Sequence, residues 1–304
     1  MARMNCNLFF VQALQPIKPK DRDPNLVFIG MPSAKGGLWD LARTIISLEL
    51  GVEELKRNGV KTRFIFRHAT GQGVAKARNN LTFAARCTPA SKVIFVDSDV
   101  PLTPAHVFRL LSHDAHLVGA LYPKKNYQRL CWVGEFDECT PEKIGPGGLW
   151  PMMSVGSGAI KFDLSVVDEL IAAYPEREFV NDEDEPKSGL ADGQLMHDLW
   201  GMGVVTDTWF GSPRHPGPRL YARYTTEDYF FSYLYRKAGG KLWTDPGCQV
   251  GHVGDVDFLE LHADVARQIE EALVRYKRDL ESVGVHVPAL VRSADPGAPV
   301  RRVN

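Results

Sequence analysis

Short apolar runs alternate with helix-patterned segments through residues 25–123 of this chain, and this alternation constrains its fold more than any other feature. The apolar runs predict strands, at 25–32, 62–69, 92–99 and 115–123. The segments between them predict helices, at 38–59, 73–87 and 104–113. Strands that alternate with helices form a mostly parallel sheet covered on both faces. We therefore expect an α/β fold.

The second half is less regular. It predicts a strand at 152–163, a helix at about 164–174, an acidic loop at 175–189 and a basic, proline-rich loop at 211–223. A helix at 226–240, a strand at 241–246 and a helix at about 258–280 follow. Since no composition shift marks a linker, we expect an N-terminal arm over 1–24, one domain over 25–285 and a mobile tail over 286–304.

Charge and cysteine content limit the classes of partner. The formal net charge of the 304 residues is −1, so no overall positive field attracts nucleic acid or an anionic membrane. The five cysteines include no CxxC pair, which favours a reducing compartment over a disulfide framework. The apolar run at 8–14 is too short to cross a bilayer. We expect no membrane span. We expect the protein to lie in the cytoplasm, or in the host cytoplasm if it is viral.

The stretch VIFVDSDV at 93–100 ends an apolar strand with Asp97 and Asp99. Alternate residues of an extended chain point to the same side, so both carboxylates are expected to face one point. Like charges so placed would raise each other's pKa unless a cation joins them, and oxygen ligands of this kind suit Mg²⁺ or Mn²⁺. The alternative is a turn role for Asp97 and a capping role for Asp99.

The order of several further motifs resembles the GT-A family of nucleotide-sugar glycosyltransferases, in its bacterial and phage-type, DxD-containing form. After the DxD stretch, the matching segments are VGSGAIKFDLSVVDEL, TTEDYFFSYLYRKAGGKLWTDP and VGHVG, and GVAKARNNLTFAA precedes it. The match spans about 25–254, so most of the chain. The resemblance implies a Rossmann-like GT-A catalytic domain with helices on both sheet faces.

The resemblance also implies roles for individual residues. Asp97, Ser98 and Asp99 take the place of the family's DxD, where Asp97 and Asp99 bind the metal that bridges the donor diphosphate. His252 matches a late metal-binding histidine, although it could also be a plain surface or core histidine. Glu227 and Asp228 match an acidic pair in which Asp228 removes the acceptor proton, while the alternative for both is capping of the helix that follows.

The remaining implied residues surround the donor. They are Pro32 and Ser33 for the base and ribose, Arg78 near the nucleotide, and Gly156, Ser157 and Gly158 beside the sugar. For Arg78 the alternative is a solvated helix face.

Together these implied residues predict metal-dependent, inverting transfer of a sugar from a nucleoside-diphosphate sugar, with UDP the expected nucleotide, to an acceptor hydroxyl. The acceptor is expected to be a carbohydrate, a lipid-linked sugar or a modified DNA base. Three other readings stay open: a haloacid-dehalogenase-type phosphatase with Asp97 as nucleophile, an inactive GT-A module that binds a sugar or nucleotide, and a nucleotidyltransferase. The last would need a glycine-rich basic loop, of which MPSAKGG at 31–37 is a poor version.

Overall fold

A computed structural model describes residues 15–33, 61–70, 73–127, 132–137, 144–181, 193–209, 219–253 and 291–292. Its described helices are α2 (Val74–Arg86), α3 (Pro104–Leu111), α4 (Leu164–Ala173) and α5 (Glu227–Lys237). The first strands are β1 (Asp23–Ser33), β2 (Arg63–Thr70), β3 (Ala90–Val96), β4 (Leu117–Leu121), β5 (Gly134–Phe136), β6 (Trp150–Val155) and β7 (Ala159–Asp163). The later strands are β8 (Glu178–Val180), β9 (Leu195–His197), β10 (Gly203–Trp209), β11 (Arg219–Thr225), β12 (Leu242–Gln249) and β13 (Val291–Arg292). The predicted helices at 38–59 and 258–280 lie outside the described residues.

The central sheet is mixed, with strand order β2-β1-β3-β7-β4-β12-β6-β5 and β13 paired with β12. The β1–β2, β1–β3, β4–β12 and β12–β13 pairs are parallel. Strand β7 runs antiparallel to both β3 and β4, between which it lies. The α/β fold with a central sheet is therefore confirmed, with antiparallel pairs concentrated at and beyond β7.

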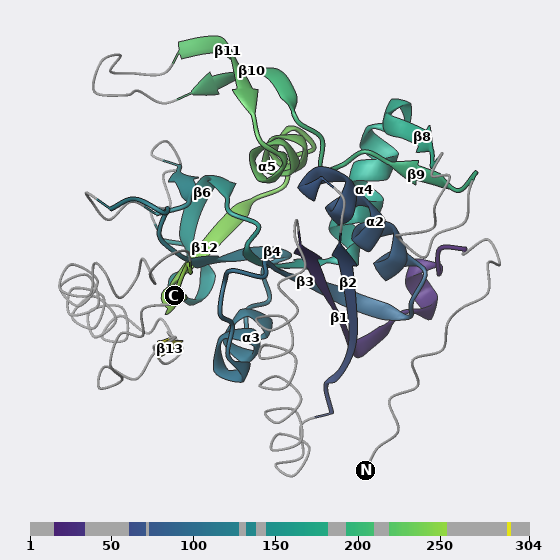
Figure 1. The fold of residues 1–304 in the computed structure, drawn as a ribbon, viewed down its shortest axis with the longest axis horizontal. Helices are drawn as coiled ribbons and strands as arrows, with labels where there is room; N and C mark the ends of the chain where they lie inside the picture. The colour runs from purple at the N-terminus through teal and green to yellow at the C-terminus, as the bar shows by residue number, and fades with distance from the viewer. Residues whose placement is uncertain are drawn as a thin grey trace.

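Helices cover both faces of this sheet (Figure 1). Alternate residues of β1 separate two apolar cores, because Leu26 and Phe28 face one side while Val27 and Ile29 face the other. The first core packs under α2, α4 and α5, and the second packs under α3. The predicted helices on both faces are confirmed.

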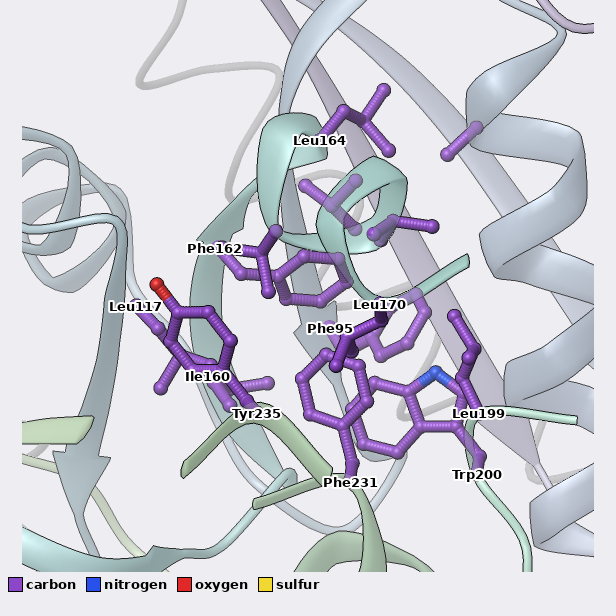
Figure 2. Packing of buried hydrophobic residues seen from close by; sticks show 14 of the residues in the cluster. Phe95, Leu117, Ile160, Phe162, Leu164, Leu170, Leu199, Trp200, Phe231 and Tyr235 are labelled. Atoms are coloured by element: carbon purple, nitrogen blue, oxygen red, sulfur yellow. The ribbon is translucent and has the colours of Figure 1, made fainter. Parts of the chain in front are cut away.

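Aromatic side chains fill the first core (Figure 2). The Trp200 ring stacks on Phe231 of α5, with centroids 3.9 Å apart and planes 4° from parallel. Phe95 of β3 and Phe162 of β7 lie against the same indole, at 5.3 and 6.1 Å. Aromatic ring contacts stabilise a core beyond their buried area. The segment around Trp200 is thereby packed against β3, β7 and α5.

The predicted strand at 152–163 is in fact two strands, β6 and β7, which are separated by a turn at 156–158. The Gly-Ser-Gly sequence at 156–158 is itself a turn signal, which the prediction of one continuous strand overlooked because apolar residues flank it on both sides. The turn sends β7 back between β3 and β4, which the sequence analysis did not anticipate.

Two hairpins stand outside the central sheet. Strands β8 and β9 pair, and β10 pairs with β11 along seven residues from Gly203–Thr225 to Trp209–Arg219. The predicted loop at 211–223 was therefore wrong at its end, since Arg219 to Arg223 belong to β11. In the part of the chain that the structure describes, no helix has both the length and the apolar character needed to cross a membrane.

Candidate active site

Strand β3 ends at Val96, and the two aspartates follow it in a turn rather than in an extended chain. The amide of Val100 donates to the carbonyl of Asp97 at 3.0 Å and closes this turn. Asp97 and Asp99 therefore do not alternate along a strand, and their carboxylates have different partners. The turn role that the sequence left open for Asp97 is present, whereas α3 begins with Thr103 as its N-cap and not with Asp99.

Arg78 of α2 lies beneath the turn and contacts two carboxylates. Its side chain is 1% exposed; Nη2 donates to Asp97 Oδ1 at 2.6 Å and Nη1 donates to Glu227 Oε1. Burial opposes the charge of Arg78, but Asp97 and Glu227 outweigh it and raise the pKa of the guanidinium. Burial also raises the pKa of Asp97, and Arg78 opposes that shift. Arg78 thus joins the end of β3 to the start of α5, and the solvated helix face expected as its alternative is wrong.

Asn79, the next residue of α2, positions the segment at 198–200, against which this guanidinium lies. Asn79 Oδ1 accepts the backbone amides of Leu199 and Trp200, both at 3.0 Å, and its Nδ2 donates to Asp198 Oδ1 at 2.8 Å. The Trp200 ring then lies 5.6 Å from the Arg78 Cζ, within cation–π range.

Asp99 meets a second pair of groups. Its Oδ2 accepts from Lys125 Nζ at 2.7 Å and lies 3.6 Å from His252 Nε2. His252 Nδ1 donates to the Pro123 carbonyl at 2.7 Å, which turns Nε2 toward the carboxylate. Burial opposes ionisation of Asp99, but His252 and Lys125 prevail and lower its pKa to about 2. Two of the three predicted metal ligands, Asp99 and His252, therefore lie together.

The acidic pair lies in the first turn of α5, whose N-cap position is Thr226. Neither Glu227 nor Asp228 is the cap residue, although negative charge in a first turn is favourable. Asp228 Oδ1 accepts from the Thr226 hydroxyl at 2.6 Å and from the Tyr229 amide at 2.8 Å. Burial raises the pKa of Asp228, although both hydrogen bonds act in the opposite direction. Glu227 is ion-paired with Arg78, whereas the hydrogen-bond donors described for Asp228 are neutral groups.

The turn at 156–158 contacts the aspartate turn through the backbone. The amide of Asp97 donates to the Gly158 carbonyl at 2.9 Å, and the amide of Gly158 donates to the Tyr122 hydroxyl at 2.9 Å. A Cβ atom on Gly156 would lie 2.2 Å from that hydroxyl, so only glycine fits there. These small residues permit a close approach, as expected, and the group that approaches them here is the phenol of Tyr122.

Three further predicted residues, Pro32, Ser33 and Ser98, make fewer described contacts with the rest of the site. Pro32 is buried near the carboxyl end of β1, in register with Ala69, and Ser33 is the last residue of the strand. Ser98 lies in the turn between the aspartates. No described contact joins these three to the carboxylates.

The protein supplies two of the ligand atoms that a divalent cation would need. Within the described residues, no group of three or more His, Cys, Asp or Glu side chains lies close enough to hold one ion. Asp99 and His252 nevertheless turn a carboxylate oxygen and an imidazole nitrogen toward each other, a pair that suits Mn²⁺. Mg²⁺-type sites commonly use one or two protein ligands and leave the remaining positions to water and phosphate oxygens.

Sequence reasoning missed Tyr122 as part of this site. The residue is 4% exposed, its ring meets His252 edge-on at 5.4 Å, and the charges of Asp97 and Asp228 act on it. Burial and those two carboxylates raise the pKa of its phenol well above the usual value. A hydroxyl-bearing residue at the end of an otherwise apolar strand, in ALYP, was the available signal.

No family model matches the chain, and no curated protein matches its sequence. Among solved structures, A197 from STIV is 11% identical with a TM-score of 0.38, over 76% of this chain and 88% of that one. GalNAc-T7 with UDP, GalNAc and Mn²⁺ is 16% identical with a TM-score of 0.41, over 80% of this chain and 47% of that one. A 4-diphosphocytidyl-2C-methyl-D-erythritol synthase from Anaerococcus prevotii DSM 20548 is 12% identical with a TM-score of 0.29, over 53% and 80%. Likenesses this distant leave function to be argued from the geometry of the chain itself.

Proposed function

We propose that this chain is a metal-dependent glycosyltransferase of the GT-A type, which moves a sugar from a nucleoside-diphosphate sugar to an acceptor hydroxyl. One observation carries the proposal: Arg78 binds Asp97 and Glu227 at once. It thereby brings the carboxyl end of β3, where ligands of open α/β sheets bind, to the acidic first turn of α5. A phosphate-binding region and an acid–base region then lie side by side.

In this reading Asp99 and His252 hold Mn²⁺ or Mg²⁺, and Asp97 lines the same turn. The cation supplies Lewis-acid stabilisation of the leaving diphosphate when it is bound. Pro32, Ser33, Ser98 and the turn at 156–158 are proposed to contact the donor, with UDP the expected nucleotide. Arg78 supports this region from beneath, since both of its terminal nitrogens are already engaged by carboxylates.

Asp228 is the proposed base for the acceptor hydroxyl. Both of its described hydrogen bonds use Oδ1, so Oδ2 is the atom to which we assign the acceptor proton. Burial raises the pKa of Asp228, and a carboxylate with a raised pKa is a stronger base in its ionised form. A base on the acceptor side corresponds to the inverting course, in which the acceptor oxygen attacks as the diphosphate leaves.

A carbohydrate acceptor, free or lipid-linked, is favoured over a modified DNA base. A DNA acceptor would need cationic side chains for its phosphates, such as the arginines of the basic segment at 211–223. Of these, Arg223 forms a bidentate ion pair with Glu135, at 2.7 and 3.0 Å, and its Cζ lies 5.3 Å from the centre of the Tyr229 ring. Its guanidinium is thus used within the protein.

The contacts of Asp97 also bear on the phosphatase alternative. A nucleophilic aspartate needs an oxygen free to attack phosphorus; Arg78 engages Asp97 Oδ1, which leaves Oδ2 as the atom that the phosphatase alternative would use. The activity test therefore has to distinguish the two reactions.

The test is nucleotide release from UDP-, GDP-, dTDP- and CMP-sugars without an acceptor, with Mn²⁺ and with EDTA. We expect slow release from one donor, which EDTA abolishes. Phosphate release from simple phosphomonoesters without any nucleotide sugar would support the phosphatase instead. Donor binding without turnover, even with a panel of sugar acceptors, would support an inactive binding module.

A further inference from the structure

The segment that follows β4 supplies two groups to Asp99. The carbonyl of Pro123 fixes the orientation of the His252 ring, and two residues later the Lys125 ammonium bonds Asp99 Oδ2. The His252 Nε2 faces that same oxygen at 3.6 Å. Lys125 therefore occupies the carboxylate oxygen of Asp99 that faces His252.

The two aspartates differ in how firmly their cationic partners are held. Arg78 is buried and fixed by carboxylates at both terminal nitrogens, so it cannot leave Asp97 without unpairing Glu227 as well. Lys125 has a side chain that is 38% exposed and a partner carboxylate that is 40% exposed. A flexible four-carbon stem with a solvated ammonium can move away at little cost.

A metal ion on Asp99 and the ammonium of Lys125 exclude each other. Both are positive, and the ammonium already occupies the oxygen that faces His252, which is the one a metal shared with His252 would use. When a diphosphate arrives with the metal, it brings negatively charged oxygens to the same place, and these are strong acceptors for a lysine. The released ammonium would then have a new partner within reach of its stem.

We propose that Lys125 is an exchangeable counter-ion, which neutralises Asp99 while the site is empty and moves to the donor diphosphate when the metal binds. This inference rests on the proposed function. It assigns Lys125 opposite effects on two ligands, because the lysine competes with the metal alone and assists the metal together with diphosphate. A lysine with only a structural role would not produce opposite signs.

The experiment compares Lys125→Met with Lys124→Met, which removes the neighbouring exposed ammonium. Mn²⁺ binding is measured by calorimetry without nucleotide, and inorganic pyrophosphate binding is then measured with Mn²⁺ present. We expect Lys125→Met to bind Mn²⁺ about threefold more tightly than the parent, the gain expected when an exposed ion pair no longer competes. The same variant should bind pyrophosphate about tenfold more weakly, as loss of a charge-assisted contact requires. Lys124→Met should follow the parent in both titrations.

Asp99→Ala separates failure of this inference from failure of the proposed function. If Asp99→Ala loses Mn²⁺ while Lys125→Met binds both ligands as the parent does, the exchange is refuted and the metal site stands. If the parent binds no Mn²⁺, or binds it as well after Asp99→Ala, the metal site of the proposed function is refuted and the exchange with it.

Discussion

Replacing Arg78 with methionine tests the buried link between β3 and α5. Methionine keeps most of the unbranched stem, so the loss is the charge, its two ion pairs and its cation–π contact with Trp200. Removing one partner of a buried pair typically costs 3–5 kcal/mol, because the other charge stays buried without compensation. Asp97 keeps partial access to solvent and can take up a proton, so we expect the lower end, about 3 kcal/mol of unfolding free energy.

The loss should depend on pH in a defined direction. Without Arg78, nothing opposes the burial that raises the pKa of Asp97 in the folded protein. A carboxyl group whose folded pKa is raised stabilises the fold below its unfolded pKa, and this contribution is lost as the pH rises through the folded value. The gap between parent and Arg78→Met should therefore be larger at about pH 8 than at about pH 5.

Urea denaturation at both pH values measures this gap, with Arg63→Met as the control. Arg63 pairs with Asp23 at the surface with a side chain that is 63% exposed, so its loss should change stability little. Adding Glu227→Gln to Arg78→Met should recover part of the stability, because one of the unpaired carboxylates is then neutral. A loss for Arg78→Met no larger than that of the control, or a gap that shrinks toward high pH, would refute the reasoning.

Three further variants test the site. Asp99→Ala should stay folded, by unchanged thermal unfolding, and lose EDTA-sensitive nucleotide release; full metal-dependent release would contradict its role as a ligand. Asp228→Asn should keep donor binding, measured by calorimetry, and lose transfer. In the parent, kcat/KM should fall on the acid side at a pH above the ordinary carboxyl pKa of about 4, because burial raises the pKa of Asp228. If Asp228→Asn instead lowers stability and leaves the activity per folded molecule unchanged, Asp228 serves only to stabilise the start of α5. Gly156→Ala should destabilise the protein by about 1–3 kcal/mol in urea denaturation, because its Cβ would lie 2.2 Å from the Tyr122 hydroxyl and 2.5 Å from Val133 Cγ1; unchanged stability would contradict this packing.

The parts of the fold that depend on local pattern were predictable from the sequence. The strands β1, β2, β3 and β4 and the helices α2, α3, α4 and α5 lie within a few residues of their predicted ranges. Each has a clear apolar period and turn residues at its ends. The β6–β7 turn was missed although Gly156, Ser157 and Gly158 form a turn signal, because the apolar runs on both sides were taken as one strand. The pairing partners of β7 could not be predicted either, because its apolar pattern is the same whether the strand runs parallel or antiparallel to its neighbours.

The candidate site was predicted in its residues and less well in its geometry. The resemblance selected Arg78, Asp97, Asp99, Glu227 and His252, all of which have charged or polar partners within the described site. The ion-pair partners of the aspartates could not be derived, because the spacing of Asp97 and Asp99 does not reveal that Arg78 pairs with one and Lys125 with the other. That information lies in α2 and in the segment after β4, which approach the turn only in the folded chain.

The position of β7 has a consequence for folding during synthesis. It is the strand that joins the β2-β1-β3 portion of the sheet to the β4-β12-β6-β5 portion, and it comes after β4 in the chain. Until the ribosome has released residues 159–163, β3 presents one unpaired edge, and β4 presents two because β12 also comes later in the chain. Such exposed edges are where nascent chains associate wrongly, and the two aspartates follow directly after one of them. A chain stalled before β7 would lack both the middle of its sheet and the backbone carbonyl that holds the amide of Asp97.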